Sequence, residues 1–304
     1  MEFIMAATSA ATAGAITNPL EVIKTRMQLQ GELMAKGEAV IHFKNFVHAG
    51  YVISKTEGFR ALQKGVIPTM WMQFLMNGSR FGFYEFFLAR GFITDKDGKT
   101  IFWKSVVFSG FGGIMGQCLA SPFYMVKTHL QSQAAKAIAV GHQHEHRGTL
   151  DAFKTIFHEH GVRGLFRGAA ASVPRALAGS ISQLTSFYYT KQWLNNYEYF
   201  RESPIAKTFV AGMVGGIAIS VTMQPFDLIL TRLYNQGVDA HGRGLLYNGF
   251  FDCLIKIYRV EGPLAFYKGL GPLYFRLGPH SVIFFLIYEG YKSTYNKLKE
   301  QIYI

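Results

Sequence analysis

The chain carries one segment three times at equal spacing. PLEVIKTRMQLQ begins at Pro19, PFYMVKTHLQSQ at Pro122 and PFDLILTRLYNQ at Pro225, so consecutive copies are 103 residues apart (122 − 19 and 225 − 122). A second segment follows each copy and ends in a glycine: EGFRALQKG at Gly65, HGVRGLFRG at Gly168 and EGPLAFYKG at Gly269. Self-similarity at a fixed period indicates one repeated structural unit. We expect three repeats, over residues 1–98, 99–200 and 201–304.

Composition places these repeats in a membrane. Of the 304 residues 49% are hydrophobic and only 16% are charged, whereas charged residues make up about 25% of soluble domains. Gly- and Ala-rich stretches precede Pro122 and Pro225, and small residues let membrane helices approach closely. After each second segment comes a stretch near the roughly 20 residues that cross a bilayer. We predict an all-α membrane protein with six transmembrane helices and both termini on one side.

The stretches between the spans are amphipathic. FKNFVHAGYVISKTEG, RGTLDAFKTIFHEHG and YNGFFDCLIKIYRVEG carry apolar residues at helical spacing together with Lys, Arg and His. They predict one short helix per repeat that lies along the membrane surface. Three soluble helical repeats in a solenoid are the alternative, but their outer faces would carry more charge. Residues 1–14 show no pattern of a removable targeting peptide.

The charge balance suits an anionic partner. The formal net charge is +12, which fits lipid head groups, nucleic acid or small acidic solutes. The basic residues are spread over three membrane-like repeats, so we expect no nucleic-acid partner. Cys118 and Cys253 lie far apart without paired Cys or His spacing, so neither a disulfide framework nor a metal site is predicted. With no nucleophile and base arrangement and no phosphate-binding loop, we predict no catalytic residues, no cofactor and no enzyme.

The two segments together resemble the signature of the mitochondrial carrier family (solute carrier family 25). That signature is Pro-x-acid-x-x-base-x-base, then acid-Gly, four residues, and aromatic-base-Gly, and the chain is similar to it three times. The segments PLEVIKTRMQLQGE and YFRLGPH further resemble the oxaloacetate-carrier subgroup. The resemblance implies a multi-pass monomer in the mitochondrial inner membrane. It would exchange small anionic metabolites by alternating access around one central site, with each short helix on the matrix side.

The resemblance implies a matrix-side gate below the proline kinks. A proline inside a spanning helix bends it, so charges just past each kink should meet. The family pairing, carried over, joins Glu21 to Lys127 and Asp227 to Lys24, while Tyr124 faces Leu230. Three residues share the next repeat position and are expected to brace these pairs by hydrogen bonds: Gln28, Gln131 and Tyr234.

The gate that the resemblance implies on the cytoplasmic side is incomplete. The family pattern there is aromatic-acid-x-x-base, but Glu85 lacks its base and Tyr188 stands where the acid belongs. The expected links are Glu85 with Lys191 and a Tyr188 hydroxyl contact to Lys292; Glu289 completes the third copy. We predict a weak cytoplasmic gate and a carrier that rests open to that side.

Pore positions that bind an asymmetric solute should carry different residues in the three repeats. Met72, Arg175 and Arg276 lie seven residues past their glycines and coincide with the family's contact points. Arg80 and Gln183 lie eight residues further on, about two helical turns. Arginine binds carboxylate bidentately, so Arg175 and Arg276 are predicted to hold a four-carbon diacid, with Gln73 and Gln183 donating to its keto or hydroxyl oxygen. His280, one turn beyond Arg276, is a candidate for proton coupling or for packing.

Three basic residues ahead of the glycines are predicted to bind acidic phospholipid such as cardiolipin at helix amino termini. The positions are Lys64 with Gly65, Arg167 with Gly168, and Lys268 with Gly269. The predicted substrates are oxaloacetate-like dicarboxylates, with sulfate and a phosphorylated keto acid as further candidates. Fatty-acid-dependent proton leak is the alternative function. Nucleotide transport is disfavoured, since the family's nucleotide carriers have Gly and an aliphatic residue where this chain has Arg175 and Ala176.

Overall fold

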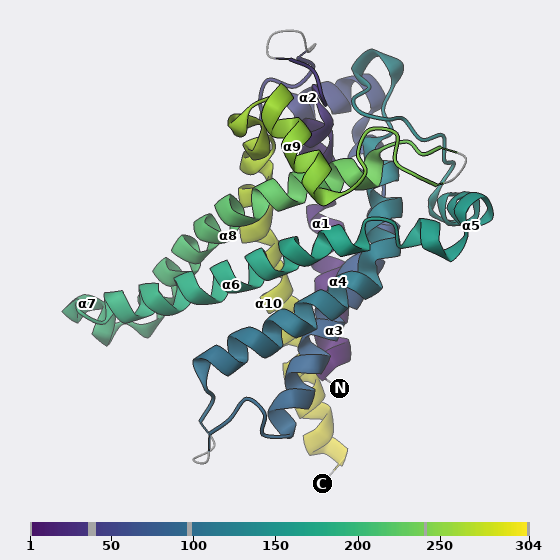
Figure 1. Ribbon diagram of the computed structural model, residues 1–304. Coiled ribbons are helices and arrows are strands. Elements are labelled where there is room, and N and C mark those ends of the chain that lie inside the picture. The colour runs from purple at the N-terminus through teal and green to yellow at the C-terminus, as the bar shows by residue number, and fades with distance from the viewer. Residues whose placement is uncertain (1, 36–40, 96–98, 240–241, 303–304) are drawn as a thin grey trace.

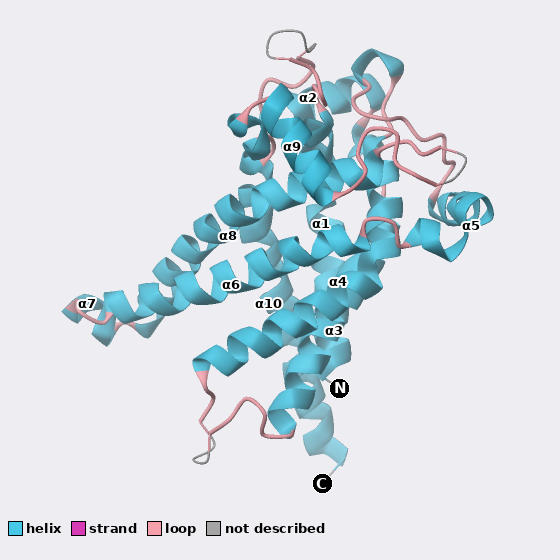
Figure 2. Ribbon diagram, in the orientation of Figure 1, coloured by secondary structure: helices cyan, strands magenta, loops and turns pink. Residues whose placement is uncertain are grey.

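Six long helices form the body of the molecule in the computed structural model (Figures 1 and 2). The structure describes residues 2–35, 41–95, 99–239 and 242–302, and these residues contain helices and loops but no β-strand. The all-α fold predicted from the sequence is therefore confirmed. The long helices are α1 (Glu2–Leu29), α3 (Val66–Ala89), α4 (Phe102–Ser132), α6 (Ala169–Leu194), α8 (Pro204–Asn235) and α10 (Leu270–Ile302).

Each repeat runs from a proline-containing helix through a short helix to a second long helix. Pro19, Pro122 and Pro225 lie inside α1, α4 and α8. The short helices are α2 (Phe46–Glu57), α5 (Thr149–Leu165) and α9 (Phe250–Val260), accompanied by the 3₁₀ turns η1 (Phe59–Gln63), η2 (Lys136–Ile138) and η3 (Pro263–Tyr267). A further short helix, α7 (Glu198–Glu202), precedes α8.

The short helices are amphipathic, as predicted. In α9, Cys253 and Ile257 are fully buried, whereas Phe251 and Tyr258 are largely exposed. Helix α5 differs from the expectation of one regular helix, because Gly161 has non-helical dihedral angles (φ 62°) that divide it in two. Glycine tolerates this left-handed conformation without a steric penalty.

Three stretches are long and apolar enough to cross a membrane by length and composition: Phe102–Ser132, Phe209–Asn235 and Pro263–Lys292. Helix α1 is not among these stretches. In α1, Glu21, Lys24 and Arg26 are at most 2% exposed, so these charges face neighbouring helices. Polar side chains in a membrane helix are tolerated when they face the protein interior, which explains why composition alone identifies only half of the six predicted spans.

The long helices converge at one end and spread apart at the other (Figure 1). The short helices α2, α5 and α9 lie around the converging end, while α7 and both chain termini lie at the spread end. At the converging end each second long helix starts at a left-handed glycine, with φ between 71° and 85°: Gly65, Gly168 and Gly269. A Cβ atom on these glycines would lie 3.0–3.2 Å from the side chains of Gln131, Tyr234 and Gln28, respectively.

Candidate functional site

A buried network of ion pairs connects the three proline-containing helices at the converging end. Glu21 and Lys24 lie on α1, Lys127 on α4 and Asp227 on α8, each within a turn or so after its proline. Lys127 is ion-paired with Glu21, and Lys24 with Asp227. All four side chains are at most 4% exposed. The structure thus brings together both pairs that the family resemblance implies for the matrix gate.

The two arginines predicted to bind substrate reach into the same network. Arg175 on α6 places Nε 2.6 Å from Oδ1 of Asp227, and its Nη1 donates to Oε1 of Gln117 over 3.1 Å. Arg276 on α10 places Nη1 2.9 Å from Oε1 of Glu21. Both arginines are buried. They point inward toward the gate carboxylates rather than outward toward lipid.

Positive charge exceeds negative charge in this network. Four cations, Lys24, Lys127, Arg175 and Arg276, share two carboxylates, Glu21 and Asp227, so two positive charges remain without a matching carboxylate in the network. Charges removed from water need paired partners. The Nε atom of Arg276 is buried with no hydrogen-bond partner among the described residues. The arrangement is therefore suited to accept an anion of charge −2.

Tyr124 replaces the acid that the family motif has at this position. Its hydroxyl donates to Oδ1 of Asp227 over 3.2 Å, and its ring faces Tyr234 with the two centroids 5.0 Å apart. Nζ of Lys127 lies 4.8 Å from the centre of the Tyr124 ring, which adds a cation–π contact. Tyr124 and Leu230 belong to one buried apolar cluster. The tyrosine thus combines with an aliphatic neighbour in place of a third ion pair.

The three predicted braces each form hydrogen bonds, but with different partners. Gln28 donates to Oδ2 of Asp227 over 3.3 Å, directly beneath an ion pair. Gln131 instead accepts from Thr25 over 3.0 Å and donates to Asn18 over 3.1 Å. The Tyr234 hydroxyl lies 2.7 Å from Oγ of Ser121. Gln28 alone of these contacts a gate carboxylate, and the other two connect neighbouring helices.

The remaining predicted substrate residues lie along α3 and α6. Met72 and Gln73 are buried, and Oε1 of Gln73 accepts from Asn77 over 3.1 Å. Arg80 is half-buried further along α3. The side chain of Gln183 lies outside the described residues. His280 is half-buried on α10, with Nδ1 3.4 Å from the Thr17 hydroxyl.

Gln117 was missed by the sequence analysis, although the threefold comparison contains a signal for it. Its counterparts 103 residues away in each direction are Gly14 and Ser220. The position therefore breaks symmetry in the way expected of a substrate contact. It was missed because only the even-numbered spans were compared with the family's contact points.

The residues predicted for the cytoplasmic gate do not come together in the structure. Glu85 is exposed, and Nζ of Lys191 lies over the Phe187 ring, 4.6 Å from its centre. The Tyr188 ring stacks on Phe102, with centroids 4.2 Å apart. Among the described side chains no ion pair joins Glu85 to Lys191. Lys292 is exposed, and the side chain of Glu289 lies outside the described residues.

The cations predicted to bind lipid have carboxylate partners in two repeats. Nζ of Lys64 lies 2.7 Å from Oε2 of Glu57, whose other oxygen accepts from Arg26 over 2.6 Å. Lys268, Glu261 and Arg232 repeat this arrangement. Burial raises the pKa of Glu57, but the hydrogen bonds from Arg26 and Lys64 outweigh it and bring the pKa down to about 2. In the second repeat Arg167 donates to the Gln236 carbonyl over 3.5 Å. Lipid contact by these cations stays a prediction.

A cavity of about 470 Å³ lies apart from the predicted substrate residues. It is bounded by the turn after α1, by residues 139–142, by Gly237 and by residues 245–246, and Glu32 and His142 contribute to its wall. Burial raises the pKa of the Glu32 carboxyl to about 7, and the Tyr247 hydroxyl donates to this carboxyl over 3.0 Å. The cavity lies between loops at the converging end rather than among the membrane-spanning helices.

Sequence comparison identifies the class of protein that this fold and site belong to. The family described as "Mitochondrial carrier protein" matches residues 1–92, 98–198 and 201–299. The chain belongs to the mitochondrial carrier family, whose members are transporters of the inner mitochondrial membrane. The converging end, which carries the short helices, corresponds to the matrix side that the family resemblance implies.

The chain is similar over nearly its whole length to several individual carriers. It is 46% identical to human "Solute carrier family 25 member 35", with 97% of this chain and 98% of the relative covered. It is 40% identical to the "Mitochondrial oxaloacetate transport protein" of Saccharomyces cerevisiae, over 92% of this chain and 85% of the relative. It is also 33% identical to the "Mitochondrial citrate transporter E" of Aspergillus niger, over 98% and 94%.

Proposed function

We propose that the chain exchanges small dicarboxylates across the inner membrane by alternating access, and that oxaloacetate-like diacids are its substrates. The observation that carries this proposal is the excess of two positive charges in the buried network of Lys24, Lys127, Arg175 and Arg276 with two carboxylates. A dianion matches that excess. The relatives named for oxaloacetate and citrate transport support the same substrate class.

Substrate and gate share the same two arginines in this account. Arg175 now binds Asp227, and Arg276 binds Glu21. A substrate carboxylate that approaches either guanidinium competes with the gate acid for it. Because Asp227 and Glu21 also pair with Lys24 and Lys127, this competition changes the balance of the ion pairs that hold α1, α4 and α8 together. Substrate binding is thereby coupled to opening on the matrix side.

The polar neighbours of the arginines suit a keto or hydroxy diacid. Gln117 accepts from Arg175, which leaves its amide nitrogen, buried and without a partner among the described residues, free to donate. Gln73 lies on α3 and is also buried. An amide that donates to a keto or hydroxyl oxygen would distinguish oxaloacetate from a plain diacid. Sulfate and a phosphorylated keto acid share the charge but differ in shape.

An uptake screen in proteoliposomes tests the proposal. Purified carrier would be assayed with radiolabelled dicarboxylates, sulfate and keto acids, for the wild type, Arg175→Ala and Arg276→Ala, with exposed Arg60→Ala as the matched control. We expect uptake of a diacid by the wild type and the control, and a loss of at least about tenfold in the two site variants, because a hydrogen bond to a charged group contributes about 1.5–3 kcal/mol.

The same preparation separates the proposal from its rival. Unchanged uptake in both arginine variants, with all proteins folded by thermal unfolding in detergent, would remove the assignment of the site. Proton conductance that depends on fatty acid and needs no exchangeable anion would favour the proton-leak function instead.

A further inference from the structure

In the second repeat a histidine stands where the other two repeats have an arginine that donates to a backbone carbonyl. In repeats one and three, Nε of Arg26 donates to the Gln131 carbonyl and Nε of Arg232 donates to the Gln28 carbonyl, each over 3.2 Å. In repeat two the equivalent residue is His129, whose Nε2 lies 2.8 Å from the Tyr234 carbonyl. The three residues therefore make the same contact with the next proline-containing helix.

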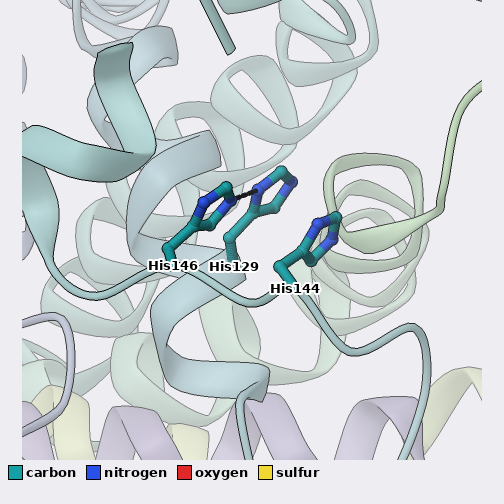
Figure 3. A group of neighbouring side chains, drawn as sticks. All are labelled: His129, His144 and His146. Atoms are coloured by element: carbon teal, nitrogen blue, oxygen red, sulfur yellow. Dashed lines mark hydrogen bonds between the residues drawn. The ribbon is translucent and has the colours of Figure 1, made fainter. Parts of the chain in front are cut away.

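This contact fixes the protonation of the His129 ring. A carbonyl oxygen only accepts hydrogen bonds, so Nε2 must carry the hydrogen and Nδ1 of the neutral ring presents a lone pair. That Nδ1 atom lies 3.2 Å from Nε2 of His146 (Figure 3). In repeats one and three the arginine also forms an ion pair with a carboxylate, Glu57 or Glu261. In repeat two the residue at the position of that acid is His160.

A third histidine, His144, also contacts a backbone carbonyl through Nε2. Nε2 of His144 lies 2.9 Å from the Asn235 carbonyl, which again leaves Nδ1 with a lone pair. Its ring stacks on His129, with centroids 3.5 Å apart and planes 7° from parallel (Figure 3). His144 and His146 are two residues apart in the loop after α4, so an extended backbone directs them to one side. One nitrogen from each of the three rings lies within 4.8 Å of the others.

We propose that His129, His144 and His146 form a binding site for a first-row transition metal ion of the Zn²⁺ class on the matrix side of the carrier. Two ligands of a tetrahedral Zn²⁺ with Zn–N bonds of about 2.0–2.1 Å lie roughly 3.3 Å apart, close to the 3.2 Å between His129 and His146. The metal would replace the proton that these two nitrogens share. The two rings now face each other almost in one plane, with centroids 5.5 Å apart and planes 5° from parallel, so both must tilt for their lone pairs to converge on one ion. His144 must turn out of the stack to point its lone pair at the same ion, and its place in a loop permits this.

Two further features agree with a metal ion at this position. A ring nitrogen bonded to a backbone carbonyl, as in His129, is the usual outer contact that orients a metal-binding histidine. A bound cation would also stand where repeats one and three have the guanidinium of Arg26 and Arg232, and so restore positive charge to all three repeats. Of the charged groups nearby, Asp151 and Glu159 attract a cation and Arg167 repels it.

The location gives the site a structural consequence. His129 lies near the end of α4, and the carbonyls that His129 and His144 contact belong to the end of α8. A metal ion held by His129, His144 and His146 would tie the loop after α4 to the end of α4, beside the end of α8.

Metal binding to the purified full-length carrier in detergent tests the proposal directly, without any transport assay. Zn²⁺ would be titrated calorimetrically into wild type, His144→Ala, His146→Ala and, as the matched control, exposed His158→Ala; His129 is left intact because it is buried and bonded to α8. We expect one Zn²⁺ per wild-type and control chain, and an affinity at least about tenfold lower in the two loop variants, since even an outer contact of a metal ligand contributes about 10–100-fold.

Thermal unfolding with and without Zn²⁺ gives the second readout. We expect Zn²⁺ to raise the Tm of the wild type and of His158→Ala but not that of His144→Ala or His146→Ala, because a ligand that binds the folded state stabilises it. A wild type that binds no Zn²⁺, or loop variants that bind it as tightly as the wild type, would overturn the proposal. Both readouts are independent of the transported substrate, so they fail or succeed separately from the proposed dicarboxylate exchange.

Discussion

Asp227 is the residue on which most of the buried network depends. Its carboxylate is fully buried and accepts from Lys24, Arg175, Tyr124 and Gln28, which come from three other helices. Burying a carboxylate is unfavourable unless several charged or polar partners compensate for lost water. The side chain therefore stabilises the contact of α8 with α1, α4 and α6 together.

Asp227→Asn is expected to destabilise the carrier strongly. It would leave Lys24 and Arg175 buried without their carboxylate, a change that costs about 3–5 kcal/mol. A clear fall in Tm in detergent checks this. Lys256→Gln is the matched control, because Lys256 forms a partly exposed i,i+4 ion pair with Asp252, and such a pair contributes less than about 1 kcal/mol. Equal effects of the two substitutions would contradict a structural role for the network.

The residue-level contacts were only partly predictable. The pairs Glu21 with Lys127 and Lys24 with Asp227 are what the family resemblance implies for these motif positions, and the structure contains both. The contacts of Arg175 with Asp227 and of Arg276 with Glu21 were not foreseen. They depend on how far a long side chain reaches between helices of different repeats, and residue spacing carries no information on that distance.

At the level of elements, the start of each even-numbered span is set by a glycine. Gly65, Gly168 and Gly269 combine a left-handed backbone with a close approach to Gln131, Tyr234 and Gln28, respectively. A side chain on these residues would meet both a backbone penalty and a steric one. The glycines predicted to assist lipid binding thus have a packing function that the structure reveals.

Gly168→Ala is expected to cost about 1–2 kcal/mol, because φ is 85° and the new methyl group would lie 3.0 Å from the Tyr234 ring. Gly212→Ala is the matched control. Gly212 lies inside α8, and a Cβ atom there would contact nothing within 4 Å, so we expect no loss of stability. The Tm values of the two variants check the prediction, and a Gly168→Ala protein as stable as the control would contradict it.

The order of elements was more predictable than their details. The spacing of the repeats and the length of the apolar stretches located the six long helices, because an apolar stretch of about 20 residues is typical of a membrane-spanning helix. The break in α5 at Gly161 was not predicted. The histidine cluster was also missed, since His129 lies on α4 while its two partners lie in the following loop. Local spacing does not reveal that the loop folds back onto the helix end.

The whole molecule is closed at the matrix end and spread at the other. The ion pairs of Lys24 and Lys127 join the proline-containing helices at the converging end. Among the described side chains no ion pair joins Glu85, which is exposed, to Lys191, which lies over the Phe187 ring. That the carrier rests open to the cytoplasmic side stays a prediction. The predicted substrate arginines are ion-paired with the gate carboxylates, Arg175 with Asp227 and Arg276 with Glu21. We propose that a diacid arriving from the spread end meets them there.

We propose that the excess of two positive charges in this network selects a dianion. Competition in proteoliposomes tests it most directly: uptake of radiolabelled oxaloacetate would be measured against unlabelled oxaloacetate and against unlabelled pyruvate, which is a keto acid with one carboxylate fewer. We predict that pyruvate competes at least about tenfold more weakly with the wild type, because one charge-assisted contact is lost, and that Arg276→Ala narrows this difference. Equal competition by the two acids would contradict the account.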